Sequence, residues 1–269
     1  MTQQAPVLVF DSGVGGITVA REIRRLMPEL PLVYAADDAA FPYGAWDGDA
    51  LARHCVATVT DLVRLHRPQA VVIACNTAST LVLPPLRQAL DIPVVGTVPA
   101  IKPAAERTRS GLVSVLATPG TVSRDYTFDL IRRFAPDIAI TLVGSKRLAA
   151  LAEDKLSGRP LDMQALAAEA AACFVSRDGR RTDVVVLACT HFPLLADELA
   201  AAAPWPVEWL DPSPAIARRL RDVIADRPPD LPDPATPPVP DKLVATSGAD
   251  LSRVLGYGLL LRERAPGTA

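Results

Sequence analysis

The sequence predicts an α/β fold of two similar lobes, each with a mostly parallel sheet flanked by helices. Short runs of β-branched and small apolar residues alternate with helix-compatible segments, which is the pattern of parallel sheets. One such run, residues 71–74, ends at Cys75 and is followed by small polar residues. The same arrangement returns at residues 184–188, which are followed by Cys189. We therefore expect two lobes, related by a pseudo-two-fold axis, that each bring a thiol to an active site in the cleft between them.

The composition excludes several classes of protein. The chain has 269 residues, which suits two α/β lobes, and its apolar and charged fractions are ordinary for a globular protein. A formal net charge of −2 without a basic block argues against a nucleic-acid or membrane-surface partner. No apolar run reaches about 18 residues and no signal sequence stands at the start, so we expect a cytoplasmic protein.

The first part of the chain alternates predicted strands with predicted helices. The strands are expected at residues 7–10, 32–36, 71–74 and 93–96, and the helices at 17–27, 49–65, 78–90 and after Ala100. The helix at 49–65 contains His54 and Cys55, which we interpret as packing or surface residues. Before it, Pro42, Tyr43 and Gly44 form a stiff turn that presents a hydroxyl and backbone amides.

Glycines fill the turn between the first strand and the first helix. Asp11 ends the strand, and Ser12, Gly13, Gly15 and Gly16 follow it closely. Such a turn directs free N–H groups at an anion, but the spacing is not G-x-G-x-x-G, and a plain tight turn explains it equally well. The position of Asp11 favours a ligand site, because ligands of open α/β sheets bind at the carboxyl ends of strands.

The second part of the chain repeats this order, beginning with a strand at residues 113–117 that ends at Thr118. Further strands are expected at 138–143, 182–188, 207–210 and 243–246, and helices at 122–134, 145–156, 162–176, 214–224 and 251–261. Prolines exclude regular structure from residues 228–240, which we expect to be an exposed loop. The chain after 211 is too short for its own core. The predicted lobes are therefore residues 1–98 plus 211–269, and residues 99–210.

Two cysteines in one cleft allow four kinds of chemistry. A redox disulfide is disfavoured because no C-x-x-C occurs. A metal site is disfavoured because only Asp11, Asp37 and His191 would add ligands, so no metal is expected. A covalent nucleophile stays open, with His191 as the base for Cys189, but it leaves Cys75 without a role. An acid/base pair on the two faces of one carbon uses both thiols and accounts for the repeat.

Thiols suit this proton transfer because their reference pKa is about 8.5. We expect Thr77 and Ser79, and likewise Thr190 and His191, to begin the helices that follow the two cysteines. The positive ends of those helices would then lower the pKa of each thiol.

Six motifs, in order from about residue 7 to 220, closely resemble those of the aspartate/glutamate racemase family. They are Phe10-Asp11-Ser12-Gly13-Val14-Gly15-Gly16, Phe41-Pro42-Tyr43-Gly44, Ala74-Cys75-Asn76-Thr77-Ala78-Ser79, Val98-Pro99-Ala100-Ile101-Lys102-Pro103-Ala104, Leu116-Ala117-Thr118-Pro119-Gly120-Thr121-Val122 and Cys189-Thr190-His191-Phe192-Pro193-Leu194-Leu195. The sequence departs from the family around Asp37 and at Trp46-Asp47-Gly48-Asp49.

The resemblance implies a cofactor-independent enzyme that interconverts L- and D-glutamate for peptidoglycan synthesis and cell shape. It implies that Cys75 and Cys189 are the acid/base residues, that Asp11 and His191 assist them, and that Cys75 serves D-glutamate. The implied substrate contacts are Asp11, Ser12, Pro42, Tyr43, Gly44, Cys75, Asn76, Thr77, Thr118, Thr190 and His191. Asp37 and Glu153 match acidic positions of the family and are expected to be auxiliary acids.

Two rivals remain from the sequence. A sister enzyme acting on aspartate, a hydantoin or maleate shares the plan with two cysteines, and a non-catalytic binder of small dicarboxylates would use the same cleft. No cofactor is expected, since none of the four lysines ends a predicted strand, as a pyridoxal phosphate lysine should. The sequence does not fix the oligomeric state, and a homodimer is one assembly that the resemblance allows.

Overall fold

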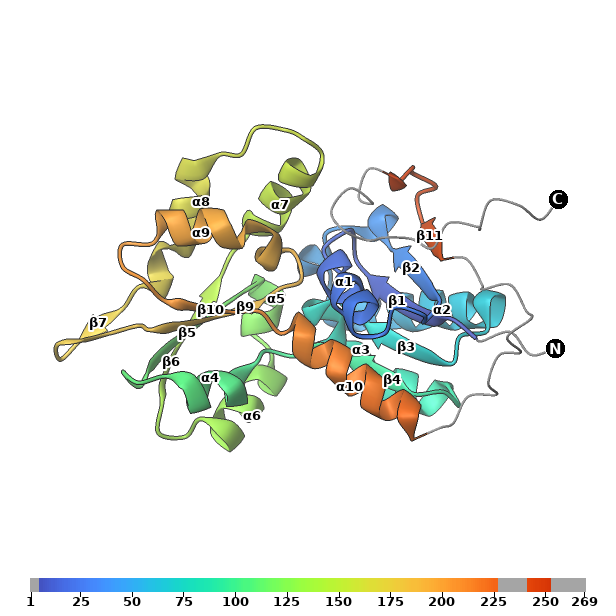
Figure 1. The fold of residues 1–269 in the computed structure, drawn as a ribbon, viewed down its shortest axis with the longest axis horizontal. Helices are drawn as coiled ribbons and strands as arrows, with labels where there is room; N and C mark the ends of the chain where they lie inside the picture. Colours follow the sequence, from blue (N-terminus) through green and yellow to red (C-terminus); the bar gives the residue numbers. More distant parts are fainter. Residues whose placement is uncertain (1–4, 227–240, 253–269) are drawn as a thin grey trace.

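A computed structural model describes residues 5–226 and 241–252, and two parallel sheets form its framework (Figure 1). The first sheet has the order β11-β2-β1-β3-β4. Its strands are β1 (Val7–Asp11), β2 (Leu32–Ala36), β3 (Ala70–Ile73), β4 (Val94–Gly96) and β11 (Lys242–Ala245). The second sheet has the order β10-β9-β5-β6. Its strands are β5 (Leu112–Ala117), β6 (Ala139–Gly144), β9 (Val184–Ala188) and β10 (Glu208–Leu210). Every pairing in both sheets is parallel, as predicted.

The two sheets repeat one topology. The order β2-β1-β3-β4 in the first corresponds to β6-β5-β9-β10 in the second, so the strand before each cysteine lies beside the first strand of its lobe. Phe10 pairs with Ile73, and Ala117 pairs with Ala188. This register brings the chain after β1 next to Cys75, and the chain after β5 next to Cys189, at the carboxyl edge of each sheet.

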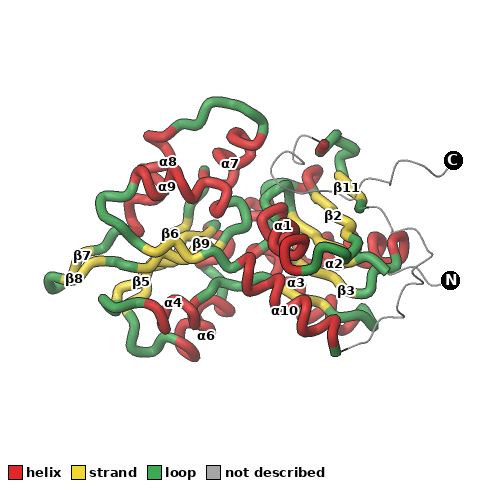
Figure 2. The backbone as a smooth tube through the Cα atoms, viewed as in Figure 1, coloured by secondary structure: helices red, strands yellow, loops and turns green. Residues whose placement is uncertain are grey.

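Helices cover both faces of each sheet, because parallel strands are apolar on both faces. In the first lobe, α1 (Ile17–Leu26) and α10 (Ser213–Ala225) share a core with Val7 and Val9. On the other face, α2 (Gly48–His66) and α3 (Asn76–Ala89) pack on Leu8 and Phe10. In the second lobe, one face carries α7 (Leu148–Leu156), α8 (Met163–Ala170) and α9 (Ala196–Ala202), and the other carries α4 (Ile101–Arg107) and α6 (Asp125–Phe134). Figure 2 shows the strands of each lobe enclosed between these helices.

Three helix predictions for the second lobe are wrong in detail. The helix expected at 122–134 is two helices, α5 (Pro119–Val122) and α6, and the helix expected at 145–156 begins only at Leu148. The helix expected at 162–176 ends at Ala170. A hairpin of β7 (Ser176–Arg177) and β8 (Arg180–Arg181) follows and projects away from the first lobe (Figure 1). Its turn residues, Asp178 and Gly179, have positive φ angles of 51° and 73°, which fits a two-residue hairpin turn.

The chain after residue 211 packs against the first lobe as far as it is described. Helix α10 packs on α1, and β11 pairs with β2. The predicted loop at 228–240 and nearly all of the predicted helix at 251–261 lie outside the described residues, and the lobe boundaries stay a prediction. In residues 5–226 and 241–252, no helix is both long and apolar enough to span a bilayer.

Asp183, which precedes β9, forms hydrogen bonds with the loop after α4. Its carboxylate accepts hydrogen bonds from Thr108 Oγ1 at 2.6 Å and from the N–H groups of Arg109 and Ser110 at 2.7 and 2.9 Å. Burial alone would raise the pKa of Asp183, but these hydrogen bonds hold it below its ordinary value. Asp183 therefore stabilises the fold above its unfolded pKa of about 3.9, and this contribution is lost as the pH falls through the lower folded value.

We predict that Asp183→Asn lowers the melting temperature at pH 7, and that the deficit shrinks as the pH falls below about 4. Thermal denaturation across this pH range measures both effects. Asp178→Asn at the exposed hairpin tip is the matched control and should have little effect at any pH, because exposed ion pairs contribute little. A deficit in Asp183→Asn that does not depend on pH would contradict the assignment.

Candidate active site

Cys75 lies two residues after the end of β3 and is the N-cap residue of α3. Its thiol is 6% exposed and donates a hydrogen bond to Ser12 Oγ at 3.7 Å. Burial raises the pKa of Cys75, and the charge of the fully buried Asp11 raises it further. These effects outweigh the N–H group of Ala78 at the start of α3. The expectation that a helix terminus would lower this pKa is therefore wrong, and Cys75 holds its proton.

Cys189 follows β9 and is also 6% exposed. Its Sγ lies 3.9 Å from His191 Nδ1, and Glu153 Oε1 lies 2.8 Å from His191 Nε2. Burial alone would lower the pKa of His191, but its hydrogen bonds to Cys189 and Glu153 raise it well above the ordinary value. The resulting imidazolium places a positive charge beside the Cys189 sulfur.

The expected helix start after Cys189 is wrong. A short 3₁₀ helix at Phe192–Leu195 follows the cysteine, and α9 begins only at Ala196. Thr190 and His191 therefore precede the helix. The cationic partner of Cys189 is the His191 side chain and not a helix terminus.

Buried hydrogen bonds join the two thiol sites across the lobes. Thr190 Oγ1 donates to Asp11 Oδ1 at 3.2 Å, and Thr18 Oγ1 donates to the Thr190 carbonyl at 3.2 Å. The charge of Cys189 acts on Cys75, and that of Asp11 acts on His191. The four residues predicted to be catalytic thus lie together where the lobes meet.

A threonine cluster crosses the same junction. Thr77 Oγ1 lies 2.9 Å from Thr118 Oγ1, and Thr121 Oγ1 lies within 3.4 Å of both. Thr121 was not among the predicted site residues, although it belongs to the motif that contains Thr118. Its position one helical turn after Thr118 is the signal that identifies it.

Asn76 follows Cys75 at the start of α3 and is 2% exposed. Neither polar atom of its side-chain amide has a hydrogen-bond partner among the described residues. An unsatisfied buried amide costs roughly 1 to 3 kcal/mol, so it calls for an explanation, and a bound ligand would supply the missing hydrogen bonds. Asn76 is therefore a ligand-binding candidate on structural grounds that are independent of its motif.

Close packing explains the glycines that follow β1. A Cβ atom on Gly15 would lie 2.3 Å from His191 Nδ1, and one on Gly16 would lie 2.8 Å from Asp11 Cβ. Real Cβ atoms do not approach so closely, so the loop needs glycine to admit the histidine ring. The N–H of Val14 in the same loop donates to Glu153 Oε1 at 3.2 Å. The sequence predicts either an anion-binding loop or a plain tight turn here. Neither prediction includes this hydrogen bond to Glu153 of the other lobe.

Asp37 and Tyr43 form a separate cluster beside this centre. The Tyr43 hydroxyl donates to Asp37 Oδ2 at 2.5 Å, and His54 Nε2 lies 2.5 Å from the same oxygen. The contact of His54 with Asp37 has no signal in the sequence, which indicates only a packing or surface residue at this position. Pro42 and Gly44 flank Tyr43, and a Cβ on Gly44 would lie 4.0 Å from Thr118 Cβ. The turn therefore reaches the junction through its backbone, while the Tyr43 hydroxyl is engaged by Asp37.

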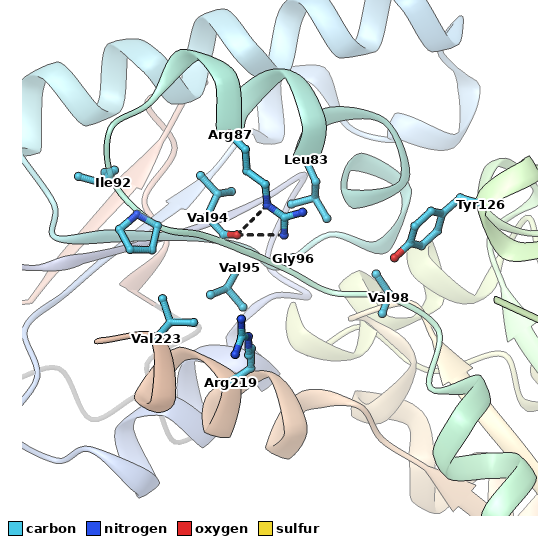
Figure 3. A pocket seen from close by; sticks show the side chains of 11 residues that line it. Leu83, Arg87, Ile92, Val94, Val95, Gly96, Val98, Tyr126, Arg219 and Val223 are labelled. Carbon is cyan, nitrogen blue, oxygen red and sulfur yellow. Dashed lines mark hydrogen bonds between the residues drawn. The ribbon is translucent and has the colours of Figure 1, made fainter. Parts of the chain in front are cut away.

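Two cavities lie on another part of the lobe junction. One of about 560 Å³ is lined by Arg87 of α3, Tyr126 of α6 and Arg219 of α10 among others (Figure 3). Within it, the Arg87 guanidinium donates to the Val94 carbonyl at 3.2 and 3.3 Å. A smaller cavity of about 270 Å³ adjoins it and shares Arg219. Neither is lined by Cys75 or Cys189.

Comparisons with known proteins agree on one family. The family model described as Asp/Glu/Hydantoin racemase matches residues 17–220. A protein named glutamate racemase from Sinorhizobium fredii is 53% identical over 97% of this chain and 98% of its own length. Another of the same name from Brucella canis is 56% identical over 83% of this chain and 81% of its own length. The crystal structure of Escherichia coli glutamate racemase with L-glutamate and the activator UDP-MurNAc-ala is 41% identical, with a TM-score of 0.84 over 94% of each chain.

We predict that iodoacetamide alkylates Cys189 faster than Cys75 near neutral pH, because only the thiolate reacts, the pKa of Cys75 is raised, and an imidazolium lies beside Cys189. Peptide mass spectrometry over a time course measures each rate. Cys55 and Cys173 are fully buried and serve as internal controls that should react more slowly than both. Equal rates, or a faster Cys75, would contradict the raised pKa of Cys75.

Proposed function

The chain belongs to the Asp/Glu/Hydantoin racemase family, and from this premise we propose that it is a glutamate racemase that works without a cofactor through two thiols. The observation that carries the proposal is the pair Cys75 and Cys189. Each is almost buried at the end of an equivalent strand, in lobes of the same topology, and each has its own proton-bearing neighbour. A racemase needs this arrangement, because it must remove a proton from one face of a carbon and return one to the other.

The two thiols suit opposite roles in a single turnover. Cys75 holds its proton beside Asp11, and we propose that Cys189, which lies beside the His191 imidazolium, acts as the base. In one direction the Cys189 thiolate takes the Cα proton, and the electron pair stays on the substrate, delocalised into the α-carboxylate. The Cys75 thiol then gives its proton to the opposite face. The product has inverted configuration, and the two sulfurs have exchanged protonation states.

The direction of each step follows the family resemblance. We propose that Cys189 deprotonates L-glutamate and that Cys75 deprotonates D-glutamate. Asp11 and His191 assist as the charged neighbours of Cys75 and Cys189. Glu153 holds His191 through Nε2.

Polar groups at the lobe junction are available for the substrate's charges. We propose that the unpartnered Asn76 amide and the hydroxyls of Ser12, Thr77, Thr118 and Thr190 bind its carboxylates and ammonium. The first N–H groups of α3 add a favourable field for an anion. Pro42, Tyr43 and Gly44 contribute backbone and ring contacts from their turn. Because the site is nearly buried, these groups act in a low-dielectric environment, where they stabilise negative charge on the carbanion more strongly than water does.

Glutamate is the substrate that the relatives favour, since those at 53% and 56% identity are named glutamate racemase. Aspartate, hydantoins and maleate are the alternatives within the family's chemistry. We further propose that the product D-glutamate is used in peptidoglycan synthesis in the cytoplasm. A binder of dicarboxylates without catalysis is the rival of another class, and isotope exchange separates it from a racemase.

We predict that L-glutamate incubated with the protein in D₂O gains deuterium at Cα and racemises. Cys75→Ser and Cys189→Ser should each reduce racemisation by about 10²- to 10⁴-fold, because each removes one acid/base group. Proton NMR and circular dichroism follow exchange and inversion. Cys75→Ser should impair exchange of D-glutamate more than that of L-glutamate, and Cys189→Ser should do the reverse.

Cys173→Ser is the matched control, because Cys173 is fully buried in the core of the second lobe. It should keep its turnover even if its melting temperature falls. Undiminished racemisation by Cys75→Ser or Cys189→Ser would remove the acid/base assignment. Binding of glutamate without any exchange by the unaltered protein would favour the non-catalytic rival.

A further inference from the structure

The buried carboxylate of Asp37 is hydrogen-bonded to three side chains. It is 1% exposed and accepts hydrogen bonds from the Tyr43 hydroxyl and His54 Nε2, both at 2.5 Å, and from Thr246 Oγ1 at 2.8 Å. These partners come from three separate segments: the turn after β2, helix α2 and the end of β11. Asp37 therefore fastens the turn to two elements of the first lobe.

His54 is held in place by aromatic neighbours as well as by Asp37. The Trp46 ring lies 5.1 Å from the His54 ring at an interplanar angle of 32°, and the Tyr43 ring meets it edge-on at 6.5 Å. Trp46 Nε1 donates to the Ala40 carbonyl at 3.0 Å, so the two ends of the turn are also joined to each other. We call Asp37, Tyr43, Trp46 and His54 the turn clamp.

The turn held by this clamp reaches the proposed site on two sides. The Phe41 ring lies 5.7 Å from the His191 ring, whose Nδ1 faces the Cys189 thiol. Gly44 approaches Thr118 of the other lobe. Neither the contact of Phe41 with His191 nor that of Gly44 with Thr118 is a hydrogen bond. Both contacts would therefore shift if the turn were not held by other residues.

We propose that His54 is a positioning residue that sets the affinity for substrate through the turn clamp. Its imidazole fixes Asp37, Asp37 fixes Tyr43, and the turn from Phe41 to Gly44 is thereby held against the second lobe. In this role Asp37 binds side chains of its own chain, and it is not the auxiliary acid that the resemblance implies. The proposal rests on the proposed function for the identity of the ligand, glutamate.

The test compares His54→Leu with His54→Gln. Leucine removes the hydrogen bond to Asp37, whereas the glutamine amide can replace Nε2 as a donor. We expect His54→Leu to raise KM for glutamate by about fivefold to tenfold, the net effect of one lost hydrogen bond. Its kcat should stay within about twofold, since the turn holds the substrate equally in the ground and transition states. His54→Gln should restore KM to within about twofold of the unaltered protein.

His66→Leu is the matched control, with the same substitution on the same helix. His66 lies in the last turn of α2, and its Nε2 has no hydrogen-bond partner among the described residues. It should leave KM unchanged. Trp46→Ala is a second variant for the case that His54→Leu does not fold, and it should raise KM in the same way because it removes the ring that supports His54.

Calorimetric binding of D-glutamate separates this proposal from the proposed function. If the unaltered protein binds glutamate without racemising it, the function fails, but the dissociation constants of the variants still test the clamp. An unchanged KM and dissociation constant in folded His54→Leu would overturn the proposal. So would a fall in kcat at constant KM, or a His54→Gln variant as weak as His54→Leu.

Discussion

The hydrogen bond from Thr190 to Asp11 is the contact on which the rest of the site depends. It is buried and 3.2 Å long. Asp11 ends β1 in the first lobe, and Thr190 lies just after the end of β9 in the second lobe. Thr18 strengthens the junction by donating to the carbonyl of Thr190. Burying a carboxylate costs free energy unless it is hydrogen-bonded. The hydrogen bond to Asp11 therefore stabilises the position of one lobe relative to the other. This relative position holds Cys75 and Cys189 within electrostatic range of each other.

The same junction makes two similar thiols chemically different. Burial and Asp11 raise the pKa of Cys75, while His191 supplies a cation next to Cys189. The histidine ring fits only because Gly15 has no Cβ. A duplicated fold therefore supplies two equivalent positions, and non-equivalent neighbours, Asp11 beside Cys75 and His191 beside Cys189, make them chemically different. A two-base racemase needs one protonated and one deprotonated group at the start of every turnover.

Much of this could be predicted from the sequence, because apolar runs that end at polar residues locate buried strands and their carboxyl ends. The runs before Asp11, Cys75 and Cys189 all became strands of parallel sheets. The pKa of Cys75 was mispredicted, since a helix terminus is visible in the sequence but burial beside Asp11 is a tertiary effect. The contact of His54 with Asp37 could not be predicted, because the two residues lie on different elements that only folding brings together. The hairpin of β7 and β8 could have been predicted from Asp178-Gly179, because Asp-Gly is a typical two-residue hairpin turn.

The most direct test of the account is a crystal structure of the unaltered protein with D-glutamate. The account predicts that Cα lies between the sulfurs of Cys75 and Cys189, which approach it from opposite faces, each within about 4 Å and so in van der Waals contact with it. Both sulfurs on the same face of Cα, or protein atoms between Cα and either sulfur, would contradict it.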